Sequence, residues 1–460
     1  MGISEKKLYF DVNKFNTLEK NASILFTSNE YFSWFKTSIT GKDILLKLNG
    51  KKVLAEVIEE IAEEYRLPKD LIEKDICKFC KASLDNNIIF ESKNSCQEVK
   101  FNNNIRSIFL DITNECNLNC LYCNKNICNA EKATFLKVNN LKIYLDKITK
   151  ENNGASILFN VSGGEPLLHK DIEGIFKVIR NYDCRIALWT NGILLNEDKA
   201  NLINEYCDYV MLSLDDTDKD SNDKIRGFGS YDAVMKSSKL CIDKEIPFFI
   251  VATPTKYNIE ALDKFISFSY DIGAEGFMIN EPILIKEDET DISQHFDYSI
   301  DKLQSKYVYM RKRTSIINSW KNSRLKFNKE NKTNLIFVED IKRCMNSIFN
   351  ISFKESCGAG VNEILIDTNG QVFPCHALNI KKYSLGSVDQ YISNKKEFVK
   401  TSSITSCNNC NYSIFCLGGC RAQALFHTKN IDGKYPSCNY EKENYKQILW
   451  SPLKAIEMKE

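Results

Sequence analysis

Three cysteines stand close together in the stretch NECNLNCLYC, where Cys116, Cys120 and Cys123 are separated by three and two residues. Metal centres in proteins usually have four ligands, so this group lacks one. In a [4Fe–4S] cluster held by three thiolates, one iron stays open to the amine and carboxylate of a small molecule. Such a complex places a sulfonium beside a centre whose potential reaches roughly −700 mV. A zinc loop with Cys128 as fourth ligand is the alternative, although structural zinc sites usually contain CxxC pairs.

The cysteine content supports a metal-binding role. The 460-residue chain has 18 cysteines but only four histidines. Its start, MGISEKKLYF, has no apolar signal region, so we expect a cytoplasmic protein with reduced thiols. This inventory favours iron–sulfur or all-thiolate sites over disulfides and histidine sites. A net charge of +1 predicts no nucleic-acid partner, and no apolar run approaches the roughly 18 residues of a membrane span.

Six strand-like segments alternate with helical ones between residues 101 and 285. The segments are SIFLDI, SILFNV, RIALWT, DYVMLSL, PFFIVAT and EGFMIN. This alternation predicts an α/β fold with a parallel sheet and right-handed crossovers. Six units suit a partial (β/α)6 barrel of the TIM type, which places its chemistry at the carboxyl ends of the strands. The cysteine loop follows the first of these strands directly.

Different patterns flank the barrel. Residues 1–100 combine strand-like KLYFDV and SILFTSNEYFSWF with helical VLAEVIEEIAEEYRL and KDLIEKDICKFCKASL, and NIIF reads as a closing strand. Together they predict a small winged-helix (α+β) domain. We expect a helical connector at 286–340, a domain rich in Cys and Gly at 341–445, where metal replaces an apolar core, and a tail at 446–460.

The three-cysteine motif, with the aromatic Tyr122 before its last cysteine, resembles the hallmark of the radical S-adenosylmethionine (SAM) superfamily. The resemblance continues through SGGEP after the second strand, TNG after the third, VMLSLDD at the end of the fourth, and DKIRGFG. It implies that the three cysteines hold a catalytic, SAM-binding [4Fe–4S] cluster. The residues that it assigns to SAM binding are Tyr122, Gly163, Gly164, Glu165, Thr190, Asn191, Ser213, Asp215 and Arg226.

These positions have different expected roles in the superfamily. The Gly-Gly-Glu turn binds the SAM amino group, and Ser213 and Asp215 match the position that binds the ribose hydroxyls. Arg226 matches an arginine that pairs with the SAM carboxylate, a role that suits guanidinium. Thr190 and Asn191 match positions near the adenosyl group. Each also has a purely structural interpretation, as a turn, a strand end or a surface arginine.

A second group of cysteines fills the C-terminal region, with a spacing that resembles the SPASM extension of radical SAM enzymes at seven positions. The resemblance implies two auxiliary [4Fe–4S] clusters, and therefore three clusters in all. Cys357, Cys375 and Cys420 would hold the first, with Cys344 as a candidate fourth ligand or an iron left open for a substrate thiolate. The second would be held by Cys407, Cys410, Cys416 and Cys438. A zinc ribbon explains only a single CxxC pair among them.

The N-terminal region is acidic where a DNA-reading helix would be basic, because VLAEVIEEIAEEYRL contains five glutamates and one arginine. The stretch ITGKDILLKLNGKKVLAEVIEEIAEEY resembles instead the leader-peptide recognition element of peptide-modifying systems. Such elements bind an extended leader as an added strand. The expected host is the hairpin SILFTSNEYFSWF, and a packing or oligomerisation domain is the alternative.

The three regions together resemble maturases of ribosomally made peptides, especially those that form sactipeptide or ranthipeptide thioethers. This implies an oxidoreductase that cleaves SAM to a 5′-deoxyadenosyl radical and installs sulfur-to-carbon cross-links in a precursor peptide. An external electron donor such as flavodoxin or ferredoxin is implied as well. Carbon–carbon cross-linking, or oxidation of one side chain as in sulfatase maturases, are alternatives. A zinc-holding regulator or an iron–sulfur electron carrier is an alternative of a different class.

Overall fold

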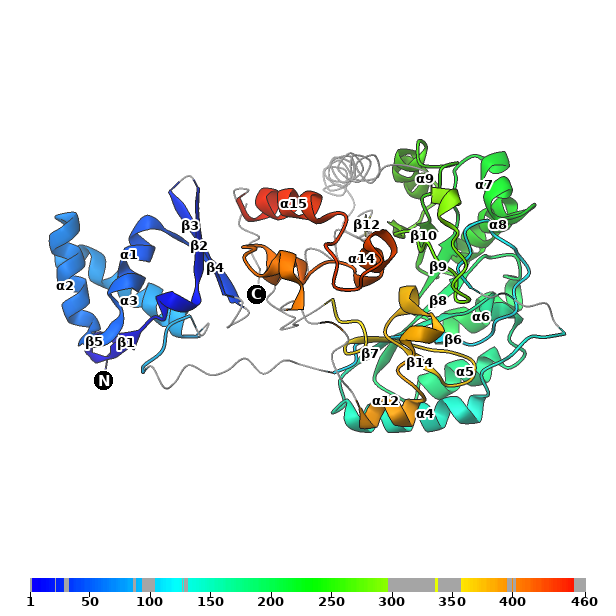
Figure 1. Cartoon of the computed structure of the whole chain (residues 1–460), viewed down its shortest axis with the longest axis horizontal. Helices are drawn as coiled ribbons and strands as arrows, with labels where there is room; N and C mark the ends of the chain where they lie inside the picture. The colour runs from blue at the N-terminus through cyan, green and yellow to red at the C-terminus, as the bar shows by residue number, and fades with distance from the viewer. Residues whose placement is uncertain are drawn as a thin grey trace.

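The computed structural model shows the N-terminal module at one end, the barrel at the other, and the C-terminal helices α14 (Arg421–Thr428) and α15 (Cys438–Trp450) between them (Figure 1). Within the described residues, no helix has both the length and the apolar character needed to cross a membrane. Cys128, Cys344 and most of the expected connector lie outside this part of the chain. The described residues are 2–20, 22–28, 33–85, 88–92, 104–125, 127, 131–296, 336–337, 357–394, 399 and 403–450.

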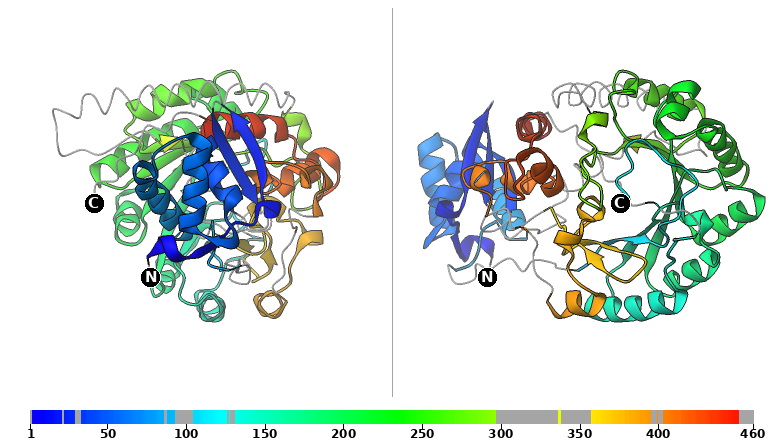
Figure 2. Two further views of the ribbon diagram at one scale, coloured as in Figure 1. Left: turned by 90° about the vertical axis from the view of Figure 1, so that its left-hand side faces the viewer. Right: turned by 45° about the vertical axis from the view of Figure 1, so that its right-hand side comes forward.

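A nine-stranded sheet forms the centre of the fold. Its central strands are parallel and neighbour one another in chain order, which confirms the predicted strand–helix alternation. These strands are β6 (Ser107–Asp111), β7 (Ile157–Ser162), β8 (Cys184–Thr190), β9 (Tyr209–Ser213), β10 (Phe248–Ala252) and β11 (Gly276–Ile279). The sheet curves into an open barrel with helices around its outside (Figure 2). The helices are α4 (Val138–Glu151), α5 (Ile172–Ile179), α6 (Glu197–Tyr206), α7 (Lys219–Arg226), α8 (Ser230–Asp243) and α9 (Phe265–Asp271).

Successive side chains on each barrel strand point to opposite faces, as the pleat of a strand requires. On β6, Ile108 and Leu110 belong to the large core beneath the helices. The alternate residues Ser107, Phe109 and Asp111 line a cavity inside the barrel. The outer face of the sheet therefore stabilises the fold, and the inner face is left to form a site.

The sheet extends beyond the six expected units at both edges. β12 (Ile336–Phe337) pairs with β11, within the range where we expected a helical connector. At the other edge, β13 (Glu363–Ile366) pairs in parallel with β6 and in antiparallel with β14 (Val372–Phe373). The C-terminal region is therefore joined to the barrel by backbone hydrogen bonds.

Short elements and tight turns make up the rest of the C-terminal region. Its helices are α12 (Val388–Ser393), α13 (Ser413–Cys416), α14 (Arg421–Thr428) and α15 (Cys438–Trp450). Leu417, Gly418 and Gly419 all have positive φ, at 52°, 83° and 70°. Glycine adopts this left-handed conformation without steric cost, so the pair allows the chain to reverse between Cys416 and Cys420.

The N-terminal module has an antiparallel sheet of β2 (Asn16–Lys20), β3 (Ser23–Ser28) and β4 (Ser33–Ser38). A smaller sheet pairs β1 (Lys7–Tyr9) with β5 (Asn49–Val53). The helices are α1 (Ile39–Lys47), α2 (Leu54–Tyr65) and α3 (Lys69–Asp85). The predicted hairpin and both predicted helices are confirmed. The strand expected at NIIF is reduced to one bridge between Phe90 and Tyr9.

Strand β3 is covered on both of its faces. Ile24 and Phe26 point into the module's own core. Leu25 points the other way and is fully buried in a cluster with Tyr412, Phe415 and Tyr445 from the C-terminal region. This contact, which we call the module interface, also includes Cys410 and Cys416. The N-terminal sheet is thus seated on the segment that carries these two cysteines.

We expect Leu25→Lys to open the module interface, because a buried ammonium without a partner is costly, while the opposite face of β3 stays packed. Hydrogen–deuterium exchange of the Ser413–Cys416 backbone should become faster. Leu46→Lys is the matched control, since Leu46 of α1 is 45% exposed. Equal exchange in the two variants would show that the interface does not form in solution.

Candidate active site

A cavity of about 740 Å³ occupies the interior of the barrel. Cys116, Cys120 and Cys123 line its end at the carboxyl termini of the strands. Polar side chains line it deeper inside, among them Asn160 and Arg185. Both its size and its mixed lining are typical of sites for small molecules or for part of a larger substrate.

Two glycines hold the cysteine loop against the turn that follows β7. The Gly164 N–H donates to the Thr113 carbonyl and the Glu165 N–H donates to the Glu115 carbonyl, both at 2.7 Å. A Cβ atom at Gly163 would collide with the Thr113 backbone, and one at Gly164 with the Glu115 backbone. We expected these glycines to admit a ligand; in the structure they allow two loops to touch.

Glu165 joins this turn to the end of β8. Its buried carboxylate accepts hydrogen bonds from Thr190 Oγ1 at 2.7 Å, from the Asn191 N–H at 2.9 Å and from the Leu167 N–H at 3.0 Å. Burial raises the pKa of Glu165, and these donors oppose the rise. The Asn191 side chain donates in turn to Asn117 Oδ1 in the cysteine loop, at 2.8 Å. The predicted SAM-binding segments therefore form one hydrogen-bonded unit with the cysteine loop.

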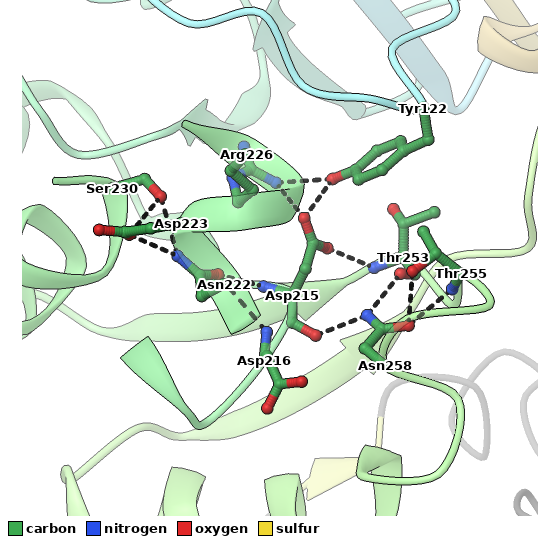
Figure 3. Close-up of polar contacts among 10 residues, drawn as sticks. All are labelled: Tyr122, Asp215, Asp216, Asn222, Asp223, Arg226, Ser230, Thr253, Thr255 and Asn258. Carbon is green, nitrogen blue, oxygen red and sulfur yellow. Dashed lines mark hydrogen bonds and ion pairs between the residues drawn. The ribbon is translucent and has the colours of Figure 1, made fainter. Parts of the chain in front are cut away.

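Tyr122, Asp215 and Arg226 contact one another at the edge of the cavity (Figure 3). The Tyr122 hydroxyl donates to Asp215 Oδ2 at 2.6 Å. Arg226 Nη1 donates to the same oxygen at 2.9 Å and to the Tyr122 hydroxyl at 2.6 Å. Asp215 is fully buried, so the ion pair is shielded from water. Burial is also the main reason why the pKa of Tyr122 is raised.

Further hydrogen bonds, from Thr253 and Asn258, hold Asp215 in place. The Thr253 N–H donates to its second carboxylate oxygen at 2.7 Å, and Asn258 Nδ2 donates to its carbonyl at 2.6 Å. Both carboxylate oxygens are thus engaged within the protein, whereas Ser213 lines the cavity. Arg226 Nε is buried and has no hydrogen-bond partner among the described residues. This donor fits the carboxylate that the sequence resemblance assigns to Arg226.

The placement of the three thiols along one end of the cavity fits a cluster. Burial raises the pKa of Cys116 to about 11 and that of Cys123 to about 12, so cluster binding would have to deprotonate them. Among the residues that the structure describes, no three His, Cys, Asp or Glu side chains converge on a point that suits one metal ion. In a [4Fe–4S] cluster each thiolate binds its own iron, so such convergence is not needed.

The first expected auxiliary group lies beside the barrel cavity. Burial is the main cause that raises the pKa of Cys375 and of Cys420, and both also respond to the charge of Cys357. Cys375 and Cys420 pack against the same hydrophobic cluster, and the Gly360 N–H, three residues after Cys357, donates to the Pro374 carbonyl beside Cys375. Glu281, which lines the cavity, also raises the pKa of Cys420 and connects this group to the barrel. The candidate fourth ligand Cys344 lies outside the described residues.

The second expected auxiliary group surrounds a small cavity of about 20 Å³ in the C-terminal region. All four expected ligands line this cavity, namely Cys407, Cys410, Cys416 and Cys438. Tyr412 and Tyr445 line it too, and both also belong to the module interface. The structure thus brings together the four cysteines that the resemblance assigns to this group, and places them next to the N-terminal module.

A charged group beside the cysteine loop was not predicted. Lys125 forms ion pairs with Asp111 and with Glu287, the latter at 3.6 Å, and Asn379 donates to both carboxylates. Burial lowers the pKa of Lys125, but the two carboxylates outweigh it and the net shift is upward. Asp111 ends β6 and Lys125 follows Cys123 by two residues, so the sequence alone could have indicated that both lie near the cysteine loop. The sequence gives no such indication for Glu287 and Asn379, because only folding brings them to this place.

Residues 110–268 match the model of the radical SAM superfamily. The chain carries a radical SAM domain. The domain contains the cysteine loop, the Gly-Gly-Glu turn and the Tyr122–Asp215–Arg226 contacts. The C-terminal cysteine groups and the N-terminal module lie outside the matched residues.

Similar proteins include enzymes with different reactions. A probable GTP 3′,8-cyclase of Methanocaldococcus jannaschii is 34% identical over 191 residues, which are 41% of this chain and 63% of that protein. A cysteine-type anaerobic sulfatase-maturating enzyme of Clostridium novyi is 26% identical over 348 residues, or 67% of this chain and 86% of that protein. The likeness to the cyclase is thus limited to part of each chain.

Solved structures of SuiB from Streptococcus suis resemble almost the whole chain. SuiB of Streptococcus suis bound to its precursor peptide SuiA has a TM-score of 0.55 and 16% identity. The match covers 93% of this chain and 98% of that one. At this identity the likeness concerns the fold, and it extends beyond the radical SAM domain.

We expect Gly164→Ala to disturb the cysteine loop, because the new methyl group must push Glu115 away, at a cost of about 1–3 kcal/mol in the free energy of unfolding. Iron retained after reconstitution should fall. The control is Gly154→Ala, where a Cβ meets no atom within 4 Å. That variant should bear only the strain of a left-handed alanine, about 1–2 kcal/mol, and keep its iron. Equal iron contents would argue against the packing role of Gly164.

Proposed function

We propose that the chain is a radical SAM peptide maturase that installs cysteine thioether cross-links in a ribosomally made precursor peptide. The observation that carries the proposal is the succession of three cysteine groups. The first lines the barrel cavity, the second neighbours the cavity wall, and the third lies at the interface with the N-terminal module. Such a succession provides both a radical site and a route for electrons.

In this proposal Cys116, Cys120 and Cys123 hold the SAM-binding [4Fe–4S] cluster. With SAM bound, the cluster supplies a 5′-deoxyadenosyl radical at the carboxyl end of the barrel. Arg226 Nε is available for the SAM carboxylate, and Tyr122 and Asp215 fix the orientation of this guanidinium. Ser213 is available for a ribose hydroxyl, and the turn at Gly163–Glu165 for the amino group.

The auxiliary clusters belong to the same proposal. Cys357, Cys375 and Cys420 would hold the first, with Cys344 as its candidate fourth ligand. The second would be held by Cys407, Cys410, Cys416 and Cys438. Each thioether leaves one surplus electron, because the 5′-deoxyadenosyl radical takes one hydrogen atom from the peptide carbon and the thiol loses its proton, and these clusters would accept that electron. An external flavodoxin or ferredoxin would supply the electron that SAM cleavage consumes.

The N-terminal module is the proposed binding site for the leader of the peptide. In its three-stranded sheet β2 and β4 are the edges, so a leader strand can be added beside either. The module interface fixes this sheet to the C-terminal region, so a bound leader would hold the core peptide at high effective concentration near the barrel. The fold likeness to a structure bound to its precursor peptide supports this assignment.

Oxidation of a single side chain is the second candidate, and the sequence similarity to a sulfatase-maturating enzyme favours it. Carbon–carbon cross-linking uses the same layout and also remains a candidate. The N-terminal module, which we propose binds the leader, favours a cross-linking maturase over a sulfatase maturase.

The test is anaerobic reconstitution with a short Cys-containing peptide encoded beside this gene. Each thioether should lower the peptide mass by two hydrogen atoms and remove one thiol from iodoacetamide labelling, with release of 5′-deoxyadenosine. A mass loss with all thiols still labelled would indicate carbon–carbon linkage. An unchanged mass, or a colourless protein that holds zinc instead of roughly twelve irons, would reject the proposal. Cys116→Ala is the inactive control.

Arg226→Lys tests the assigned SAM contact. Lysine keeps a positive charge beside Asp215 but cannot supply a second donor in the position of Nε. We expect the dissociation constant for SAM to rise about tenfold, as for loss of one charge-assisted hydrogen bond, with unchanged iron content. Lys224→Arg, on the exposed side of the same helix, should leave SAM binding unchanged. Wild-type affinity in Arg226→Lys would remove Nε from the binding site.

A further inference from the structure

Arg421 is a buried arginine beside the two auxiliary cysteine groups. It begins α14 directly after Cys420, and only 1% of its surface is exposed. Its side chain donates hydrogen bonds to backbone carbonyls alone. The acceptors are Ile431 at 3.1 Å, Gly433 at 2.9 Å, Gly419 at 3.4 Å, and Gly418.

These contacts leave the charge of Arg421 without compensation. Two other arginines of the chain have carboxylate partners, Arg180 with Asp208 and Arg226 with Asp215. No carboxylate among the described residues forms an ion pair with Arg421. Carbonyl oxygens satisfy its donors but bring no net negative charge. Burying an unpaired charge is costly, so an anion is expected close to this guanidinium.

Both cysteine groups lie close to Arg421. The residue follows Cys420 of the first group directly in the chain. Its guanidinium donates to the carbonyl of Gly418, which lines the cavity of the second group. Arg421 is thus next to a ligand of one group in the chain and hydrogen-bonded to the cavity lining of the other. Its positive charge therefore lies close to both groups.

We propose that Arg421 is the shared counter-ion of the two auxiliary iron–sulfur clusters and raises the reduction potential of both. The inference rests on the cluster set in the proposed function. A [4Fe–4S] cluster with thiolate ligands is an anion and gains one negative charge on reduction, so a nearby cation stabilises the reduced form. Because Arg421 adjoins both groups, its charge would favour an electron on either cluster.

The experiment is a redox titration of the full chain, followed by electron paramagnetic resonance. Alanine at Cys116, Cys120 and Cys123 removes the SAM cluster and leaves the auxiliary signals. In this background Arg421→Gln removes the charge, whereas Arg421→Lys keeps it. We expect both auxiliary potentials to fall in Arg421→Gln and to stay near their starting values in Arg421→Lys. Arg180→Gln, which removes an arginine that has its own carboxylate partner, should change neither.

Each result has a definite meaning. Unchanged potentials in Arg421→Gln, or an equal fall in both Arg421 variants, would overturn the proposal, since charge would then not be the cause. If Arg421→Gln loses iron, retention by Arg421→Lys supports the role of the charge, and equal loss from both counts against it. A background protein without auxiliary clusters would instead refute the cluster set in the proposed function.

Discussion

The contact between the cysteine loop and the turn after β7 is the constraint on which the rest of the site depends. Backbone meets backbone there, and the two hydrogen bonds from Gly164 and Glu165 leave no room for a side chain at either glycine. Glu165 carries the connection on to Thr190 and Asn191. Three loops that follow three parallel strands are thereby fixed at one end of the barrel. Without this contact the cysteines would lie on an unsupported loop.

Buried charged side chains are the second feature that shapes the structure. Near the cysteine loop, Asp215 neutralises Arg226, and Lys125 has two carboxylate partners. These pairs are hydrogen-bonded on several sides, as a buried ion pair must be to offset its loss of hydration. Arg421 differs, because its described partners are all neutral carbonyl groups. The contrast is what makes the cysteine groups around it the expected source of negative charge.

The C-terminal region is connected both to the barrel and to the N-terminal module. Strand β13 ties the C-terminal region to the first barrel strand, and the module interface ties the N-terminal sheet to the same region. The C-terminal region therefore contacts both the place proposed for the leader and the place proposed for the radical. This arrangement gives a physical basis for a peptide that is held in one region and modified in another.

Much of this protein could be inferred from the order of its residues. The strand–helix alternation predicted the parallel barrel, because each amphipathic segment must bury one face against its neighbours. The resemblance of the cysteine spacing to a known extension implied their groups, and the structure gathers Cys407, Cys410, Cys416 and Cys438 around one cavity. Cys438 joins the other three only through folding, since α14 separates it from them in the chain.

Only the tertiary structure decided which distant residues meet. The pairing of β13 with β6, the burial of Leu25 on the C-terminal region, and the contact of Asn379 with Asp111 join segments far apart in the chain. The hydrophobic periodicity of a segment does not predict such long-range contacts, because they depend on how whole helices and strands pack. The sequence by itself therefore determined the chemistry that is available. The fold determined which groups are oriented toward the cavity and which, like Asp215, hold those groups in place through hydrogen bonds.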